Sequence, residues 1–265
     1  MDQPLLSVRD VTVRFGGIVA LQAVTFDVHS SGICGLIGPN GAGKTTLFNC
    51  LSRLYDFQQG DILFEGRSIK GVSTHGIASL GIGRTFQNLA LFRTMSVRQN
   101  VMVGAHCRSK AGFVAGMLQW PWTQQEETDL SRKADRILDL LRLDAVADRS
   151  VAELPFAVQK QVELARALAA EPTLLLLDEP ASGLNHTELI ELAEWIRIIR
   201  NQMNITILLV EHHMSLVMTV SDHIVALNFG RKIAEGTPAE IQANPVVIEA
   251  YLGLDDARKR CELAT

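Results

Sequence analysis

Hydrophobic and polar positions follow two periods along this chain, one typical of strands and one typical of helices. Loose alternation over Leu5–Arg14 and Leu21–Val28 predicts two strands of a half-exposed sheet. The dipeptide Glu65-Gly66 separates two short runs, Asp61–Phe64 and Arg67–Ile69, and is typical of a hairpin turn. We therefore expect strands that pair through tight turns near the start of the chain.

Apolar runs predict further strands, and these are Ile33–Ile37, Leu174–Leu177, Ile205–Val210 and Ile224–Leu227. Helical spacing occurs in Lys44–Leu54 and again in Thr187–Arg200. In the second of these, acidic residues come early and basic residues late, which complements the helix dipole. Strands that alternate with helices predict a mainly parallel sheet.

The middle of the chain has a different character. Ser96 is placed to cap a helix that runs to about Ala105, and a second helical stripe contains Ala134, Ile137, Leu138 and Leu141. Between them, Ser109–Gln125 is irregular and contains the cluster Trp120-Pro121-Trp122. These tryptophans either pack under a loop or form a docking surface for another protein. We interpret the helical middle as an insertion into the order of the sheet.

Composition narrows the class of protein. The chain has 265 residues, with 25 Lys plus Arg against 29 Asp plus Glu and a net charge of −4. This balance argues against a dedicated nucleic-acid binder, which needs clustered cations. No run reaches the ~20 apolar residues that span a bilayer, and the start of the chain does not resemble a secretory signal. The four cysteines form no CxxC pair, so we expect reduced thiols in an intracellular protein.

One segment matches the phosphate-binding pattern G-x-x-x-x-G-K-[ST], and it consists of Gly38, Pro39, Asn40, Gly41, Ala42, Gly43, Lys44 and Thr45. Its glycines allow backbone N–H groups to curl around phosphate oxygens, and the following helix presents its positive N-terminus. Lys44 can reach the β- and γ-phosphates, while the Thr45 hydroxyl can bind Mg²⁺. The pattern follows a predicted strand and opens a predicted helix, which is the context that it requires. We therefore predict phosphate binding here.

A pair of acidic residues supports the same chemistry. Asp178 and Glu179 directly follow the apolar run of four leucines. A buried strand can place Asp178 beside a Mg²⁺ ion held by Thr45. Glu179 then lies where a carboxylate can polarise a water molecule in line with the γ-phosphate.

In this order and spacing, the motifs resemble those of the ATP-binding subunit of an ABC transporter, and the resemblance covers nearly the whole chain. It implies an α/β P-loop NTPase fold of the ABC ATPase type. We expect a mainly parallel core sheet, an N-terminal antiparallel β subdomain and an inserted helical subdomain. A single ABC ATPase domain would cover residues 1–265. Its nucleotide-binding core would be 1–93 and 165–254, its helical insertion 94–164 and its tail 255–265.

The resemblance also implies a role for each matching residue. Residues expected to bind ATP are Phe15, Gly38, Pro39, Asn40, Gly41, Ala42, Gly43, Lys44, Thr45, Thr46 and Gln87. Residues expected to hold Mg²⁺ are Thr45, Gln87 and Asp178. Residues expected to act in catalysis are Lys44, Glu179 and His212. Phe15 would stack on adenine, Gln87 would sense the membrane partner, and Ser182–Asn185 resembles the D-loop.

Several segments are similar to the branched-chain amino-acid uptake group, and these are Thr85–Asn88, Asp178–Asn185, Val210–Met214, Ala234–Ile241 and Glu249–Gly253. That likeness implies a bacterial importer with two permease subunits, two ATPase subunits and an external solute-binding protein. The chain would work peripherally at the cytoplasmic face of the cell membrane. Whether the ATPase pair is a homodimer or a heterodimer stays open. Relatives of this group move urea, short amides or other amino acids, so the solute also stays open.

The chain departs from the family at the ABC signature, which is normally close to L-S-G-G-Q. The aligned segment is Leu154–Gln161, leading into Val162–Ala170. Ala157 and Val158 stand where the group usually keeps glycine and glutamine. A Cβ at Ala157 can limit backbone approach or forbid a positive φ, and Val158 has no polar group. We hypothesise that the Walker motifs are competent while this signature is weakened, against the alternative of a tolerated or engineered change.

Two functions from other classes are alternatives. A soluble ABC ATPase of translation or repair generally has two tandem cassettes or a long coiled-coil insert, and this chain has neither. A nucleotide-gated module without turnover would agree with Ala157 and Val158. Retention of Glu179 and His212 argues against it.

Overall fold

The computed structural model describes residues 3–85, 89–105 and 121–251, with the backbone alone over 121–127. The chain divides into two compact units, which we describe separately. The first comprises Met1–Thr74 and Leu176–Thr265, and the second comprises His75–Leu175. The predicted insertion, 94–164, falls inside the second unit, which extends beyond the insertion in sequence at both ends. The division into core, insertion and tail stays a prediction.

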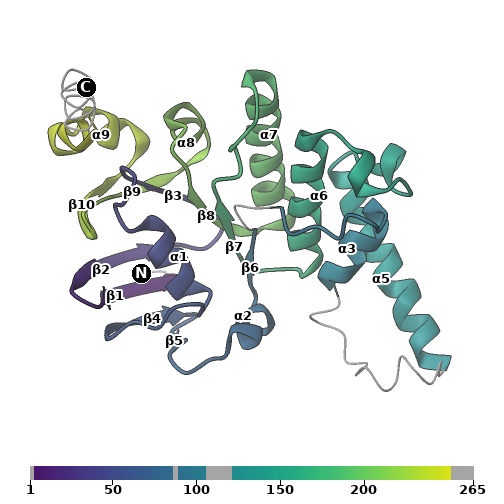
Figure 1. The fold of residues 1–265 in the computed structure, drawn as a ribbon, viewed down its shortest axis with the longest axis horizontal. Coiled ribbons are helices and arrows are strands. Elements are labelled where there is room, and N and C mark those ends of the chain that lie inside the picture. Colours follow the sequence, from purple (N-terminus) through teal and green to yellow (C-terminus); the bar gives the residue numbers. More distant parts are fainter. Residues whose placement is uncertain (1–2, 86–88, 106–120, 252–265) are drawn as a thin grey trace. The chain divides into compact units, whose positions relative to one another are not determined.

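The N-terminal part of the first unit is an antiparallel sheet with strand order β2-β1-β4-β5 (Figure 1). Its strands are β1 (Leu6–Phe15), β2 (Ile18–Val28), β4 (Gln59–Phe64) and β5 (Arg67–Ser68). Leu6 pairs with Val28 of β2 on one side and with Phe64 of β4 on the other. The strands predicted from the loose alternation, and the turn at Glu65-Gly66, are thus confirmed.

The core sheet contains strands in the order β10-β9-β3-β8-β7. They are β3 (Ile33–Ile37), β7 (Leu174–Asp178), β8 (Thr206–Val210), β9 (His223–Asn228) and β10 (Arg231–Gly236). β3 is parallel to β8 and to β9, and β10 is antiparallel to β9. Every residue of β3, β7 and β8 is buried, as expected for strands of a covered parallel sheet. The mainly parallel core is confirmed.

The helices of the first unit are α1 (Lys44–Leu51), α7 (His186–Met203), α8 (Met214–Val220), α9 (Pro238–Ala243) and a helical segment over 245–251. α7 begins with a capping box, in which the Asn185 side chain accepts from the Glu188 N–H and the Glu188 carboxylate accepts from the Asn185 N–H. α1 was expected to reach Leu54 but ends at Leu51. Arg53 adopts a left-handed φ of 56°, which stops the helix.

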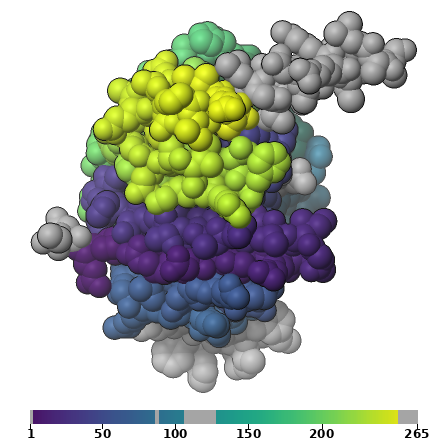
Figure 2. Space-filling view, turned by 90° about the vertical axis from the view of Figure 1, so that its left-hand side faces the viewer, coloured from purple at the N-terminus to yellow at the C-terminus, as the bar shows by residue number. Residues whose placement is uncertain are grey.

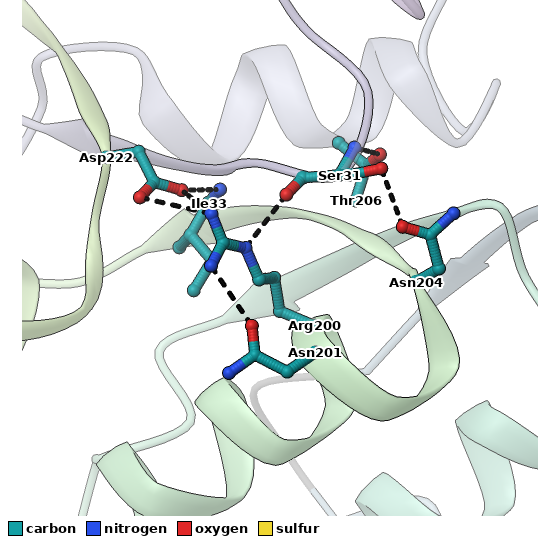
Figure 3. Close-up of polar contacts among 7 residues, drawn as sticks. All are labelled: Ser31, Ile33, Arg200, Asn201, Asn204, Thr206 and Asp222. Carbon is teal, nitrogen blue, oxygen red and sulfur yellow. Dashed lines mark hydrogen bonds and ion pairs between the residues drawn. The ribbon is translucent and has the colours of Figure 1, made fainter.

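A polar network holds the chain at the start of β3 (Figure 3). Arg200, in the last turn of α7, donates to the Ser31 carbonyl at 2.8 Å and forms an ion pair with Asp222 at 3.3 Å. The Asp222 carboxylate also accepts from the Ile33 backbone N–H at 2.8 Å. The Ser31 N–H donates to the Thr206 hydroxyl at 2.9 Å. This network fixes where β3 begins, and therefore where the loop after β3 lies.

We expect Asp222→Ala to lower the free energy of unfolding by about 1–3 kcal/mol, because it leaves the Ile33 N–H without its acceptor and Arg200 without its counter-charge. Asp222→Asn keeps an acceptor oxygen and should lose less. Denaturant unfolding of the three proteins measures the difference. Equal losses in the alanine and asparagine variants would contradict the role assigned to the Ile33 bond.

Over the residues that the structure describes, the second unit is mainly helical. Its elements are α2 (Thr74–Leu80), β6 (Ile82–Arg84), α3 (Val97–Ala105), α5 (Pro121–Leu140), α6 (Phe156–Ala169) and 3-10 turns at Asp144–Val146 and Val151–Glu153. α3 packs on α5 and α6, and a Cβ on Gly104 would lie 2.0 Å from the Arg166 carbonyl oxygen. Arg98 forms hydrogen bonds with Asp135 and Asp148, which raise the pKa of Arg98.

In the part of the chain that the structure describes, no helix has both the length and the apolar character that a membrane span requires.

The helix predicted after Ser96 is confirmed as α3, and its cap as well. The Ser96 hydroxyl accepts from the Gln99 N–H at 3.2 Å, while the Gln99 side chain accepts from the Ser96 N–H at 2.9 Å. The stripe that includes Ala134 and Leu138 lies on α5 and is buried there. Trp120 and the side chain of Trp122 lie outside the described residues.

Candidate functional site

The loop between β3 and α1 has the backbone shape that its glycines allow. Gly38, Gly41 and Gly43 have φ values of 151°, 81° and 101°. A Cβ on Gly38 would lie 2.2 Å from the Leu227 carbonyl oxygen, and one on Gly43 would lie 2.7 Å from the Ala20 carbonyl oxygen. Only glycine fits at Gly38 and Gly43, because the backbone of neighbouring strands approaches there.

A second backbone contact holds this loop from the turn between β9 and β10. The Gly230 N–H donates to the Ala42 carbonyl at 3.0 Å, and the Gly230 carbonyl accepts from the Gln22 N–H at 2.8 Å. Gly230 has a φ of 74°, and a Cβ there would lie 2.5 Å from the Ala20 carbonyl oxygen. Gly230 lies outside the motifs recognised in the sequence. The signal was a glycine between two apolar runs, which marks a close backbone approach.

Lys44 lies folded into the loop and is only 6% exposed. Its ammonium donates to the Gly38 carbonyl at 2.5 Å and to the Pro39 carbonyl at 3.0 Å. Desolvation lowers the pKa of Lys44, and the charges of Glu179 and Asp178 oppose that shift. The lysine predicted to bind phosphate is therefore within electrostatic reach of the two acids predicted to serve catalysis.

The acidic pair lies at the carboxyl end of β7. Asp178 is buried, and Glu179 is 20% exposed at its side chain and has a left-handed φ of 47°. The Glu179 N–H donates to the Val210 carbonyl at 2.9 Å, which ties the end of β7 to the end of β8. His212, two residues beyond β8, has its Nδ1 4.0 Å from a Glu179 carboxylate oxygen. The structure thus brings Glu179 and His212 together.

Glu211 organises this edge of the sheet and was not singled out from the sequence. Its side chain is fully buried, and its carboxylate accepts from the backbone N–H groups of Ala181 at 2.6 Å, His212 at 3.1 Å and His213 at 3.3 Å. Ligand-type atoms of Glu211, His212 and His213 lie within 4.8 Å of one another. Because Glu211 is already used by three backbone donors, we assign it to positioning. The feature of the sequence that could have indicated Glu211 is its position directly after an apolar strand.

The remaining predicted residues are distributed as follows. Phe15 is 45% exposed at the end of β1 and meets the Tyr55 ring edge-on with centroids 5.2 Å apart. Asn40 and Thr45 are exposed on the loop and on the first turn of α1, while Thr46 is half-buried. Gln87 lies outside the described residues.

The signature segment, in the second unit, forms the start of α6. Pro155 is the N-cap residue and offers no side-chain hydrogen bond, and the helix begins at Phe156. The helix was expected nearer Val162. Ala157 is therefore helical and not among the described residues with positive φ, so its Cβ causes no backbone strain in this chain. Ala157 and Val158 are half-buried in the first turn.

These features define a class of protein. A glycine-rich loop joins a buried strand to a helix, and acids lie at the carboxyl ends of neighbouring strands. This is the arrangement of P-loop proteins, which bind nucleotide phosphates.

Comparisons with known proteins narrow the class. A family model described as "ABC transporter" matches residues 21–182, and one described as "Branched-chain amino acid ATP-binding cassette transporter" matches 231–257. The chain is 42% identical to the high-affinity branched-chain amino acid transport ATP-binding protein BraF of Pseudomonas aeruginosa and 44% identical to LivG of Escherichia coli K12, each over 96% of this chain and 99% of the relative. The crystal structure of the ADP conformation of MJ1267, an ATP-binding cassette of an ABC transporter, superposes with a TM-score of 0.83 at 29% identity, over 95% of this chain and 100% of that one. The chain belongs to the ABC transporter family of ATP-binding proteins, in its branched-chain amino-acid group.

Proposed function

We propose that this protein is the ATP-hydrolysing subunit of an importer for branched-chain or related amino acids. It would work peripherally at the cytoplasmic face of the membrane, with two permease subunits and a second ATPase subunit. An external solute-binding protein would deliver the solute, and no nucleic acid would take part. The names of BraF and LivG and the match over 231–257 support the solute class.

The proposal is carried by the buried Lys44, which lies in the loop predicted to bind phosphate and whose pKa is lowered by desolvation against the opposing charges of Glu179 and Asp178. Glu179 would polarise the attacking water, because its carboxylate is partly exposed next to His212. Lys44 and His212 would stabilise charge on the γ-phosphate. Phe15, exposed at the end of β1, would stack on the adenine ring.

The residues present suit Mg²⁺, which prefers oxygen ligands. The Thr45 hydroxyl, the Asp178 carboxylate and the Gln87 amide oxygen would hold the ion directly or through water. The ion would neutralise phosphate charge when it is bound. ATP would close two ATPase subunits head to tail, each phosphate-binding loop facing the partner's signature segment, and closure would drive the permeases.

Reconstitution of the complex in proteoliposomes tests the function. With ATP and Mg²⁺ inside and binding protein outside, we expect uptake of radiolabelled leucine, isoleucine or valine that stops when ATP is omitted. Uptake of urea or short amides instead would correct the solute class. ATP hydrolysis without uptake of any of these would contradict a role in their import.

A second candidate is a nucleotide-gated subunit with weak turnover at the site that uses its own signature. The observation behind it is the first turn of α6, where Pro155 provides no cap and Phe156 is exposed. Neither Ala157 nor Val158 offers a side-chain donor to a phosphate. Turnover of the assembled transporter after Glu179→Gln, compared with turnover after the equivalent change in the partner, separates the two functions.

A further inference from the structure

An exposed aromatic pair lies at the end of the hairpin formed by β1 and β2. These two strands lie at the surface of the first unit, in purple in Figure 2. Phe15 ends β1 and pairs with Ile18, the first residue of β2, so the turn between them consists of Gly16 and Gly17. Cβ atoms on these two glycines would meet no atom beyond their chain neighbours within 4 Å. The turn therefore leaves open space beside Phe15.

The second ring of the pair is Tyr55, which follows α1 in the chain. Phe15 is 45% exposed and Tyr55 is 41% exposed, and their rings meet with centroids 5.2 Å apart and an angle of 73° between the ring planes. Edge-to-face contacts of this kind are a favoured geometry for two aromatic rings. Such a contact uses at most one face of the Phe15 ring, so another face remains for a planar ligand.

The backbone of Tyr55 is bonded to α1, the helix that begins at Lys44. The N–H groups of Leu54 and Tyr55 both donate to the Asn49 carbonyl, at 2.8 Å and 3.1 Å. Asn49 itself belongs to α1. The position of Tyr55 is therefore fixed relative to the helix that follows the phosphate-binding loop.

The residues after Tyr55 are also bonded to β1. The Gln58 N–H donates to the Thr12 carbonyl at 3.0 Å, and the Gln58 side-chain oxygen accepts from the Arg14 N–H at 2.9 Å. The segment that carries Tyr55 thus connects β1, which presents Phe15, with α1, which begins at the phosphate-binding loop. A ring on this segment is suited to restrain Phe15.

We propose that Tyr55 is a positioning residue for the base of the nucleotide, and that it holds the Phe15 ring in the orientation that stacks on adenine. This rests on the proposed binding of ATP and on the stacking role of Phe15. A ring that is already restrained loses less side-chain freedom when a ligand stacks on it, so the restraint strengthens binding. A ligand that has phosphates but no base gains nothing from Tyr55.

Titration calorimetry of the full-length chain with two probes tests this role. The probes are a non-hydrolysable ATP analogue and inorganic tripolyphosphate, each with Mg²⁺. We expect Tyr55→Ala to raise the Kd for the ATP analogue about 2- to 10-fold, the range expected for the loss of one aromatic pair, and to leave the Kd for tripolyphosphate unchanged. Tyr55→Phe keeps the ring and should bind both probes as wild type does. In the assembled complex, Tyr55→Ala should raise KM for ATP by the same factor and retain kcat.

Two further variants are the controls. Leu54→Ala changes the neighbouring exposed apolar residue, whose N–H bonds the same carbonyl, and should leave both Kd values unchanged. Phe15→Ala should raise the Kd for the ATP analogue at least as much as Tyr55→Ala does, because it removes the stacking ring itself.

An unchanged Kd for the ATP analogue in Tyr55→Ala, with a raised Kd in Phe15→Ala, would overturn this proposal alone. An equal rise for both probes would also overturn it, because a displaced phosphate-binding loop would then explain the effect. A Tyr55→Phe variant that binds as weakly as Tyr55→Ala would do the same, since the ring would then not be the group that matters. An unchanged Kd in Phe15→Ala would overturn the stacking role and this proposal with it. Wild-type protein that binds neither probe would overturn this proposal and the proposed function together.

Discussion

Glu179→Gln is expected to lower ATP turnover of the assembled transporter by about 10²- to 10⁴-fold, the usual contribution of a positioned general base. Glutamine keeps the size of the side chain but cannot accept the proton of the attacking water. The backbone bond from Glu179 to Val210 does not involve the side chain, so the end of β7 should keep its position. ATP should still bind, since the loop around Lys44 is untouched.

Phosphate release in single-turnover and steady-state assays measures the loss, and bound nucleotide is identified after rapid filtration. We expect the variant to retain ATP where wild-type protein retains ADP. Glu191→Gln on α7 is the matched control, because Glu191 is exposed and should leave turnover unchanged. Turnover within a few-fold of wild type in Glu179→Gln would remove this residue from the chemistry.

The same substitution tests the weakened signature. If the transporter contains two different ATPase chains, the strong site pairs Lys44 and Glu179 of this chain with the partner's signature. Glu179→Gln should then abolish most of the turnover, and the equivalent change in the partner should abolish little. Equal losses from the two changes would contradict the asymmetry.

Strands and loop chemistry were predictable because they depend on local pattern. A short apolar run that ends at a glycine-rich turn, such as Ile33–Ile37, is typical of a buried strand. The structure shows β3 with the predicted bounds. The start of α6 was not predictable to the residue. Pro155 is favourable before a helix but does not require one, so the helix begins earlier than the expected Val162.

Contacts across long sequence separations could not be predicted. Glu211 bonds the Ala181 N–H 30 residues away, and no local pattern indicates that acceptor. Tyr251 packs on the cluster that contains Ile37 only because α8, α9 and β3 share a core. Gly230 could be recognised as a turn residue, but its bond to Ala42 follows from the neighbouring positions of two turns. Residues that position other residues of a site through long-range contacts are therefore the ones that a single sequence does not reveal.

Lys44→Met is expected to weaken ATP binding and to lower turnover by about 10²- to 10³-fold, because a cation aimed at phosphate charge is lost. In the absence of nucleotide, however, the substitution should not lower the stability of the folded protein. Burial lowers the pKa of Lys44 below its unfolded value, so the charged form is disfavoured in the folded state. Methionine fills a similar volume without a charge. The variant should be at least as stable as wild type at neutral pH.

The pH dependence of the free energy of unfolding tests the predicted direction of this stability change. Between the lowered pKa of Lys44 and the ordinary pKa of a lysine, the unfolded chain binds more protons than the folded chain. The stability of wild-type protein relative to Lys44→Met should therefore increase as pH rises through that window. Chemical unfolding at several pH values, with and without ATP, measures both effects, and Lys70→Met at an exposed site is the control. A variant that is less stable at neutral pH and equally stabilised by ATP would contradict both the desolvated ammonium and its role in binding phosphate.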